Sequence, residues 1–174
     1  GGSIAMGKTT VSKQLAENTG IKRVSMDEIK ETLFDVGGYR GREWSKEIGR
    51  LAFPVFMGII EMYLRQGESV IADSTFLWPE DANWLHEFAD LHGADIYQIW
   101  MTADPQIARQ RFILRAQTER HPGHNDSLDS VIAEFDEKHF SRCFIPLPLR
   151  GKTMVIDTSK EEPFDHEAIL KFIN

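Results

Sequence analysis

The sequence predicts an α/β fold with three layers, in which helices cover both faces of a central parallel β-sheet. Short apolar segments alternate with segments of helical periodicity along the whole chain. A glycine-rich segment stands directly before the first predicted helix. Such alternation is typical of parallel sheets, whose binding crevice lies at the carboxyl ends of the strands.

Length and composition fit one globular domain over residues 1–174, with 41% hydrophobic and 27% charged residues. No apolar run approaches the roughly 18 residues of a membrane span, and no secretory leader is visible. Cys143 is the only cysteine, so we expect no internal disulfide and a cytoplasmic location. A net charge of −7 disfavours a general nucleic-acid binder but allows a local basic patch.

In the first half of the chain, helical spacing starts at Thr9 and Gly20 is a stop signal. Asp27 opens a second helix, which the glycine pair Gly37 and Gly38 ends. One apolar stripe runs along a long third helix and is predicted to contain Trp44, Ile48, Leu51, Val55, Ile59 and Met62. We expect helices over 9–19, 27–34 and 43–66, and strands over 22–25 and 69–72.

In the second half, Pro79 starts a helix because proline is favoured at the first helical position. Residues 120–124 interrupt the helical pattern. We expect helices over 79–92, 105–118, 126–144 and 164–174, and strands over 95–101 and 153–156. The strand that normally precedes a glycine-rich loop of this kind is expected to lie before residue 1.

The opening segment fits the phosphate-loop pattern G-x-x-x-x-G-K-[ST] in full. Its glycines let the backbone form a nest of N–H donors, Lys8 reaches the β- and γ-phosphate oxygens, and Thr9 can ligate Mg²⁺. The following helix directs its positive end at the same anion. The ATP-binding residues are therefore predicted to be Gly2, Ser3, Ile4, Ala5, Met6, Gly7, Lys8, Thr9 and Thr10.

Two aspartates follow predicted strands. Asp27 comes after the strand at 22–25, where a substrate hydroxyl would approach the γ-phosphate, and its carboxylate can accept the hydroxyl proton. Alternatively, Asp27 caps its helix. Asp73 ends an apolar strand and can hold Mg²⁺ or bind substrate, or can cap a turn beside Ser74.

A basic run over residues 109–127 is interpreted as a lid. Arg111 and Arg115 are four apart and can reach the same phosphate from one helix face, while Gly123 supplies a hinge. The alternative is a solvated charged face. Metal binding is not favoured, because the two histidines lack further ligands nearby. The run contains Arg109, Arg111, Arg115, Arg120, His121 and His124.

Candidate substrate contacts come from two loops. Arg40 and Arg42 stand in the glycine-rich loop at 37–42, and Trp78 follows the strand that ends at Asp73. The aromatics at helical spacing are interpreted mainly as core, although they could line an acceptor pocket: Trp44, Phe53, Phe56 and Trp84.

These motifs resemble the small P-loop kinases grouped with zeta toxins, chloramphenicol phosphotransferase and the kinase domain of polynucleotide kinase. The resemblance implies a nucleoside-kinase-like P-loop fold, ATP and Mg²⁺, with Asp27 as general base. It also implies phosphate contacts from Arg111 and Arg115, less securely from Arg120, and an adenine near residues 157–159. The specific segments are 2–10, 24–29, 71–75, 101–105 and 155–158.

The leading hypothesis is an ATP-dependent phosphotransferase that acts on a hydroxyl of a small molecule. Lys8, Arg111 and Arg115 would neutralise the moving phosphoryl group, and Asp27 would take the proton. A 5′-hydroxyl kinase of nucleic acids is an alternative, which the net charge of −7 disfavours. The third hypothesis is a nucleotide-binding switch that has no acceptor.

Overall fold

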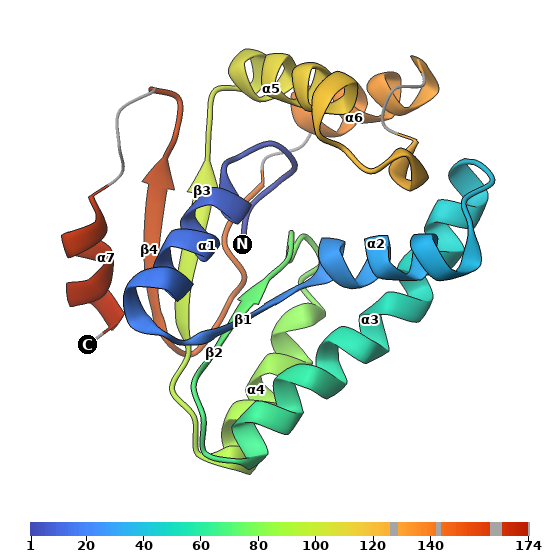
Figure 1. Ribbon diagram of the computed structural model, residues 1–174. Helices are drawn as coiled ribbons and strands as arrows, with labels where there is room; N and C mark the ends of the chain where they lie inside the picture. The colour runs from blue at the N-terminus through green and yellow to red at the C-terminus, as the bar shows by residue number, and fades with distance from the viewer. Residues whose placement is uncertain (126–128, 142–143, 161–164, 174) are drawn as a thin grey trace.

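The computed structural model describes residues 1–125, 129–141, 144–160 and 165–173. Cys143 and the last two positions of the predicted lid, 126 and 127, lie outside these ranges. Strands alternate with helices in the predicted order (Figure 1). The strands are β1 (Lys22–Ser25), β2 (Val70–Asp73), β3 (Tyr97–Thr102) and β4 (Lys152–Asp157).

Helices connect the strands and form most of the described chain. They are α1 (Lys8–Thr19), α2 (Met26–Gly37), α3 (Arg42–Arg65), α4 (Asp81–His92), α5 (Pro105–Thr118), α6 (Asp129–Ser141) and α7 (His166–Ile173), with a 3₁₀ turn η1 (Pro122–His124). Several boundaries differ from prediction, two of them for a clear physical reason. Helix α4 starts at Asp81 rather than Pro79, because Pro79 and Glu80 form a turn closed by the Asp81 N–H on the Trp78 carbonyl. Helix α2 continues to Gly37 and ends at Gly38, whose φ is 73°.

All described strand pairs are parallel, as predicted. Strand β1 pairs with β2, and β3 pairs with β4. Gly1 and Gly2 lie between the two pairs: the Gly2 N–H donates to the Thr75 carbonyl just beyond β2, and Gly2 forms a parallel bridge with Met101 of β3. A Cβ at Gly2 would lie 2.3 Å from the Met101 carbonyl oxygen, so only glycine allows this approach.

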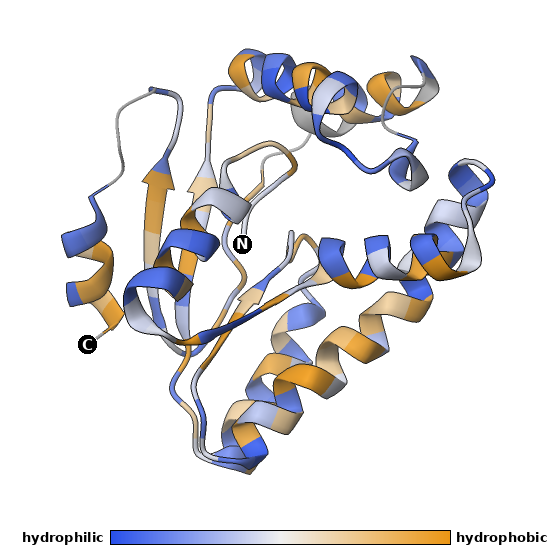
Figure 2. Cartoon of the chain, in the orientation of Figure 1, coloured by the Kyte–Doolittle hydropathy of each residue, from blue (hydrophilic) through white to orange (hydrophobic). Residues whose placement is uncertain are grey.

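Helices cover both faces of the strands, which confirms the three-layer α/β fold (Figure 1). One core joins α1, α5, α6 and α7 to β3, and the stacked rings of Phe112 and Phe135 lie in it. The other joins α3 and α4 to β1 and β3 through Phe56, Trp84 and Trp100. On α7, for example, the apolar side faces the strands (Figure 2).

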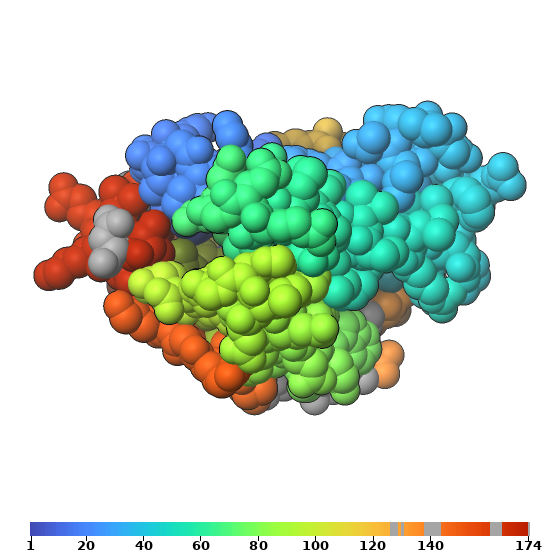
Figure 3. All heavy atoms as spheres, turned by 90° about the horizontal axis from the view of Figure 1, so that it is seen from below, coloured from blue at the N-terminus to red at the C-terminus, as the bar shows by residue number. Residues whose placement is uncertain are grey.

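Helix α3 is amphipathic and packs beside α4 at one end of the molecule (Figure 3). Its buried side carries Ile48, Ala52, Phe56 and Ile60 at helical spacing. The predicted stripe is therefore wrong in part, because Leu51, Val55 and Met62 are exposed. None of the helices in the described ranges is both long enough and apolar enough to cross a bilayer.

Phe56 provides a test of the α3 core. Its ring is fully buried against Phe76 and Trp84, so Phe56→Ala should lower the free energy of unfolding by roughly 3–5 kcal/mol. Leu51→Ala on the same helix, where the side chain is 58% exposed, should change it by less than about 0.5 kcal/mol. Urea denaturation of both variants measures the difference, and equal losses would refute this packing.

Candidate active site

The loop that precedes α1 has the backbone of an anion-binding nest. Gly2 and Gly7 have φ values of 123° and 82°, and Ala5 adopts a positive φ of 61° although it carries a side chain. Gly7 is the N-cap of α1 and provides no side-chain cap. The first N–H groups of the helix therefore point at the loop without a side-chain acceptor, as a phosphate site requires.

Lys8 projects into this loop and is strongly desolvated. Its Nζ donates to the Ser3 carbonyl at 2.6 Å. Burial lowers the pKa of Lys8 to about 8, even though the carboxylates of Asp27 and Asp73 work in the opposite direction. A multiply charged anion in the loop would restore the full charge of this ammonium.

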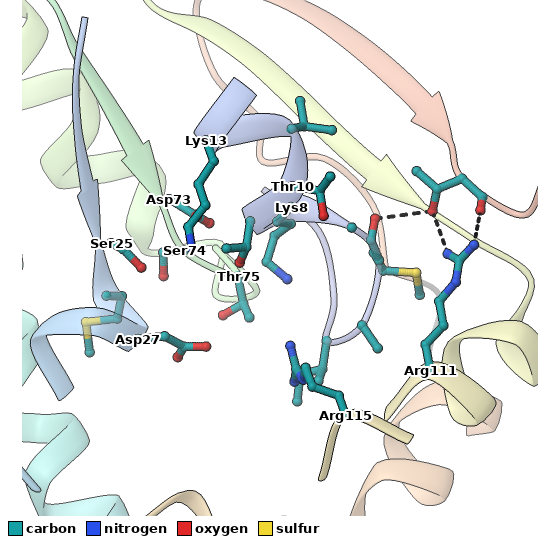
Figure 4. A pocket seen from close by; sticks show the side chains of 18 of the residues that line it. Lys8, Thr10, Lys13, Ser25, Asp27, Asp73, Ser74, Thr75, Arg111 and Arg115 are labelled. Carbon is teal, nitrogen blue, oxygen red and sulfur yellow. Dashed lines mark hydrogen bonds between the residues drawn. The ribbon is translucent and has the colours of Figure 1, made fainter. Parts of the chain in front are cut away.

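Thr158, directly after β4, fixes the position of the loop. Its Oγ1 donates to the Met6 carbonyl, or alternatively to the Thr102 carbonyl, both at 3.2 Å. Arg111 of α5 donates to the Thr158 carbonyl at 2.7 Å and to Oγ1 at 3.1 Å (Figure 4). These bonds bring Arg111 and Thr158 beside the loop.

Asp73 is a buried carboxylate at the end of β2. Its Oδ2 accepts hydrogen bonds from Ser12 Oγ at 2.6 Å and from Arg23 Nη2 at 2.8 Å. The Arg23 and Asp73 side chains are only 9% and 5% exposed. Asp73 therefore belongs to a buried ion pair and does not cap a turn.

Asp27 lies in the first turn of α2, and the N-cap of that helix is Ser25, whose hydroxyl accepts from the Glu28 N–H. The capping alternative for Asp27 is therefore wrong. Its Oδ2 instead accepts from Arg120 Nη1 at 2.7 Å. Burial opposes ionisation, but the charge and hydrogen bond of Arg120, together with Lys8, outweigh it and hold the pKa of Asp27 well below its usual range.

One cleft of about 1440 Å³ collects these groups. Figure 4 shows Asp27 and Asp73 on one side of the phosphate loop and Arg115 and Arg111 on the other, with Lys8 between them. The predicted residues that line it are Ile4, Ala5, Met6, Gly7, Lys8, Thr9, Thr10, Asp27, Arg42, Asp73, Arg111, Arg115, Arg120 and His124. Gly2 and Ser3, also predicted to bind ATP, are not among the lining residues. The phosphate loop with α1, the start of α2, the end of β2 and helix α5 thus converge on one cleft, as expected at the carboxyl ends of parallel strands.

Some predicted residues are not brought to the cleft. Arg40 lies over the ring of Trp44 at 5.1 Å, while Arg42 lines the cleft and pairs with Glu134 at 2.9 Å. Trp78 is 66% exposed and is not among the lining residues. Roles for Arg40 and Trp78 in substrate binding stay predictions.

Arg109 is also outside the cleft, where it pairs with Asp136 of α6 at 2.7 Å. Phe56 and Trp84 are buried in the α3–α4 core, in agreement with the core interpretation.

Sequence reasoning missed two residues of the site, Arg23 and Glu31. Arg23 gave a signal, since it stands two residues before Ser25 on one short strand and so points to the same face. Glu31 follows Asp27 by four residues and shares its helix face. Only the tertiary structure shows that Glu31 meets Arg120 and His124 of the lid and that Arg23 meets Asp73.

The donors near the loop fit a magnesium ion. Thr9 lines the cleft, and Asp73 keeps its second oxygen, Oδ1, without a hydrogen bond within the described ranges. Oxygen donors of this kind suit Mg²⁺, which is commonly held by one or two protein groups plus substrate phosphates. No cluster of three or more His, Cys, Asp or Glu metal ligands occurs in the described part of the chain, so such an ion would depend on the nucleotide.

This loop, with its lysine and threonine at the carboxyl end of a parallel sheet, defines a P-loop nucleotide-binding domain. The chain belongs to the AAA domain family, whose model matches residues 1–138. Its fold is similar to a crystal structure described as a "putative kinase" from Chloroflexus aurantiacus J-10-fl, with 30% identity and a TM-score of 0.86. The similarity covers 97% of this chain and 91% of that one. No curated protein sequence matches.

Arg23→Met tests the buried ion pair. Removal of one partner leaves the Asp73 carboxylate buried without its cation and should lower the free energy of unfolding by roughly 3–5 kcal/mol. Arg150→Met is the matched control, because Arg150 pairs with Asp90 at 2.6 Å but both side chains are more than half exposed. Its cost should stay below about 1 kcal/mol. Chemical denaturation compares the two, and similar small losses would contradict the account.

Proposed function

We propose that this protein is an ATP-dependent phosphotransferase that transfers the γ-phosphate of ATP to a hydroxyl group of a small molecule. One observation carries the proposal: an ionised carboxylate, Asp27, faces the same cleft as the phosphate-loop lysine. A site that only binds nucleotide has no need of such a carboxylate, since negative charge near the γ-phosphate weakens binding.

The cationic groups are suited to the charge of a transferring phosphoryl group. Lys8 lies in the loop, and the charge of Arg115 acts on it and helps to lower its pKa. Arg111 is fixed beside the loop by Thr158. In this proposal these three residues neutralise charge on the phosphate oxygens, which is the main catalytic contribution in phosphoryl transfer.

Asp27 is proposed to position the acceptor hydroxyl and to receive its proton. Its pKa lies far below neutrality, so the carboxylate is ionised throughout the physiological range. A strongly basic group is not needed, because the transition state of phosphoryl transfer is loose and the proton leaves late. Orientation of the nucleophile is then the main contribution of Asp27.

Thr9 and Asp73 are the proposed protein ligands of Mg²⁺, an ion that would reduce the negative charge of the β- and γ-phosphates. Arg23 and Ser12 hold one oxygen of Asp73. Because Oδ2 is held, the orientation of the carboxylate is fixed. Its other oxygen, Oδ1, would therefore already point in a defined direction before nucleotide binds.

The cleft is large enough for two ligands. Its volume of about 1440 Å³ exceeds the roughly 300–1,000 Å³ of pockets that hold one small ligand, which suits ATP and an acceptor side by side. The walls beside Asp27 carry charges of both signs, with Glu28 and Glu31 near Lys30. Arg42 is paired with Glu134, so this part offers no continuous basic track for a nucleic acid.

The first experiment measures ADP release from Mg·ATP with a panel of acceptors: antibiotics, nucleosides, sugars and oligonucleotides. We expect one class of small molecule to raise turnover above the hydrolysis background. Asp27→Asn should abolish that rise, by about 10²-fold or more, while ATP binding is retained. Asp90→Asn, on the exposed side of α4, is the control and should leave the rise unchanged.

If turnover rises equally in Asp27→Asn, the proposed role of this carboxylate is wrong. If ATP binds and no acceptor of any class raises turnover, the proposal gives way to the nucleotide-binding switch, which predicts an ATP-dependent protein association instead.

Lys8 makes nucleotide binding depend on pH. Because burial lowers the pKa of Lys8 to about 8 in the free protein, the phosphates should raise it on binding and take up about half a proton per nucleotide at pH 8. At pH 6.5, Lys8 is already charged and adds no uptake. Calorimetry in buffers of different ionisation enthalpy measures this quantity. Lys8→Arg remains charged and should lack the uptake at pH 8; an unchanged uptake would exclude Lys8 as its source.

A further inference from the structure

The segment that follows α5 is docked on α2 beside Asp27. Phe34 of α2 is fully buried between His121, which stacks on it with ring centroids 5.5 Å apart, and His124, which meets it edge-on at 5.4 Å. A Cβ at Gly123 would lie 2.4 Å from Phe34. This close packing fixes the backbone of η1 and with it the position of His124.

A chain of hydrogen bonds runs from this packed turn to the candidate base. His124 Nε2 lies 3.0 Å from Glu31 Oε1, and His124 Nδ1 lies 3.0 Å from Arg120 Nη2. Arg120 Nη1 in turn donates to Asp27 Oδ2 at 2.7 Å. Glu31 and Asp27 both come from α2. The lid residues His124 and Arg120 therefore link these two carboxylates by hydrogen bonds across one face of that helix.

The chemistry of Arg120 fixes the proton on His124. A guanidinium can only donate, so Nδ1 of His124 has to accept, and the proton of a neutral ring has to be on Nε2, where it donates to Glu31. Protonation of Nδ1 would place an N–H against the Nη2–H of Arg120. It would replace a hydrogen bond by repulsion.

The surroundings of His124 favour this neutral form. The side chain is 4% exposed. The charged groups that face it are Glu31, Asp27 and Lys30 of α2 and Arg120 of its own segment, and burial, the largest effect, lowers the pKa of the ring despite the Glu31 contact. The hydrogen bond from His124 lowers the pKa of Glu31, which therefore remains an ionised acceptor.

We propose that His124 is a positioning residue for phosphoryl transfer: as the neutral Nε2–H tautomer, it aims Arg120 at Oδ2 of Asp27. The proposal rests on the role of Asp27 in the proposed function. Within the described ranges Asp27 Oδ1 accepts no hydrogen bond, so the clamp on Oδ2 presents Oδ1 to the acceptor hydroxyl. His124 itself touches neither substrate nor phosphate in this account.

Two isosteric variants separate the two hydrogen bonds of His124. An asparagine oxygen can take the place of Nδ1 and accept from Arg120, whereas a glutamine nitrogen can take the place of Nε2 and donate to Glu31. We expect His124→Gln to lower kcat by about tenfold or more, the cost of a lost bond to a charged group, with the KM for ATP unchanged within about twofold. His124→Asn should retain kcat within about threefold.

The pH profile of kcat provides a readout that simple loss of packing would not move. As pH falls, protonation of His124 releases Arg120, so the wild type should lose activity on its acid side, below the ordinary histidine range. His124→Asn should lack this acid limb. An identical limb in wild type and His124→Asn, or equal kcat losses in the Asn and Gln variants, would overturn the proposal.

A measurement without turnover separates this inference from the proposed function. ¹⁵N NMR of the histidine rings in the nucleotide-free protein should show His124 as the neutral Nε2–H tautomer at pH 7, and Arg120→Gln should raise its pKa because the adjacent positive charge is removed. A charged ring, or the Nδ1–H tautomer, would refute the clamp even if the enzyme is a kinase. If the NMR result holds but Asp27→Asn retains full turnover, the clamp exists and the role of Asp27 in the proposed function is wrong.

Discussion

Buried positive charge is the constraint on which this site depends. Lys8 sits in a loop where its only recorded partner within the described ranges is a carbonyl oxygen, and Arg115 and Arg120 add their charge to the same cleft. A buried cation is costly unless an anion compensates it. In the free protein, two carboxylates provide this compensation. Asp27 pairs with Arg120, and Asp73 pairs with Arg23. A nucleotide would supply further negative charge at the place where the loop has N–H donors to receive it.

The same constraint explains why two carboxylates with different surroundings occur at neighbouring strand ends. Asp73 is almost completely buried and is held by Ser12 and Arg23, which makes it rigid. Asp27 keeps half of its side-chain surface exposed in the cleft and has one oxygen held by the lid. The rigid group suits an ion that demands fixed geometry, and the more accessible group suits an acceptor that has to enter and leave.

Most of the fold could be predicted from the sequence, because helical periodicity, glycine stops and short apolar strands are local signals. The phosphate loop was equally accessible, since residues 2–9 act together as one contiguous motif. The partners of Asp27 and Asp73 could not be predicted from the sequence. Arg120 is 93 residues from Asp27 and Arg23 is 50 residues from Asp73, and no local pattern distinguishes Arg120 from Arg109, which pairs with Asp136 instead. Packing around η1 and α6 decides which arginine pairs with Asp27 and which with Asp136, and sequence spacing does not encode that packing.

The fate of the γ-phosphate tests the central claim most directly. ATP labelled at the γ position is incubated with the protein and each acceptor, and the products are separated into inorganic phosphate and phosphate esters. A phosphotransferase should place the label in a new ester whose yield depends on the acceptor. Label that appears only as inorganic phosphate, at a rate independent of every acceptor, would contradict the account and make the cleft a site of ATP hydrolysis or of binding alone.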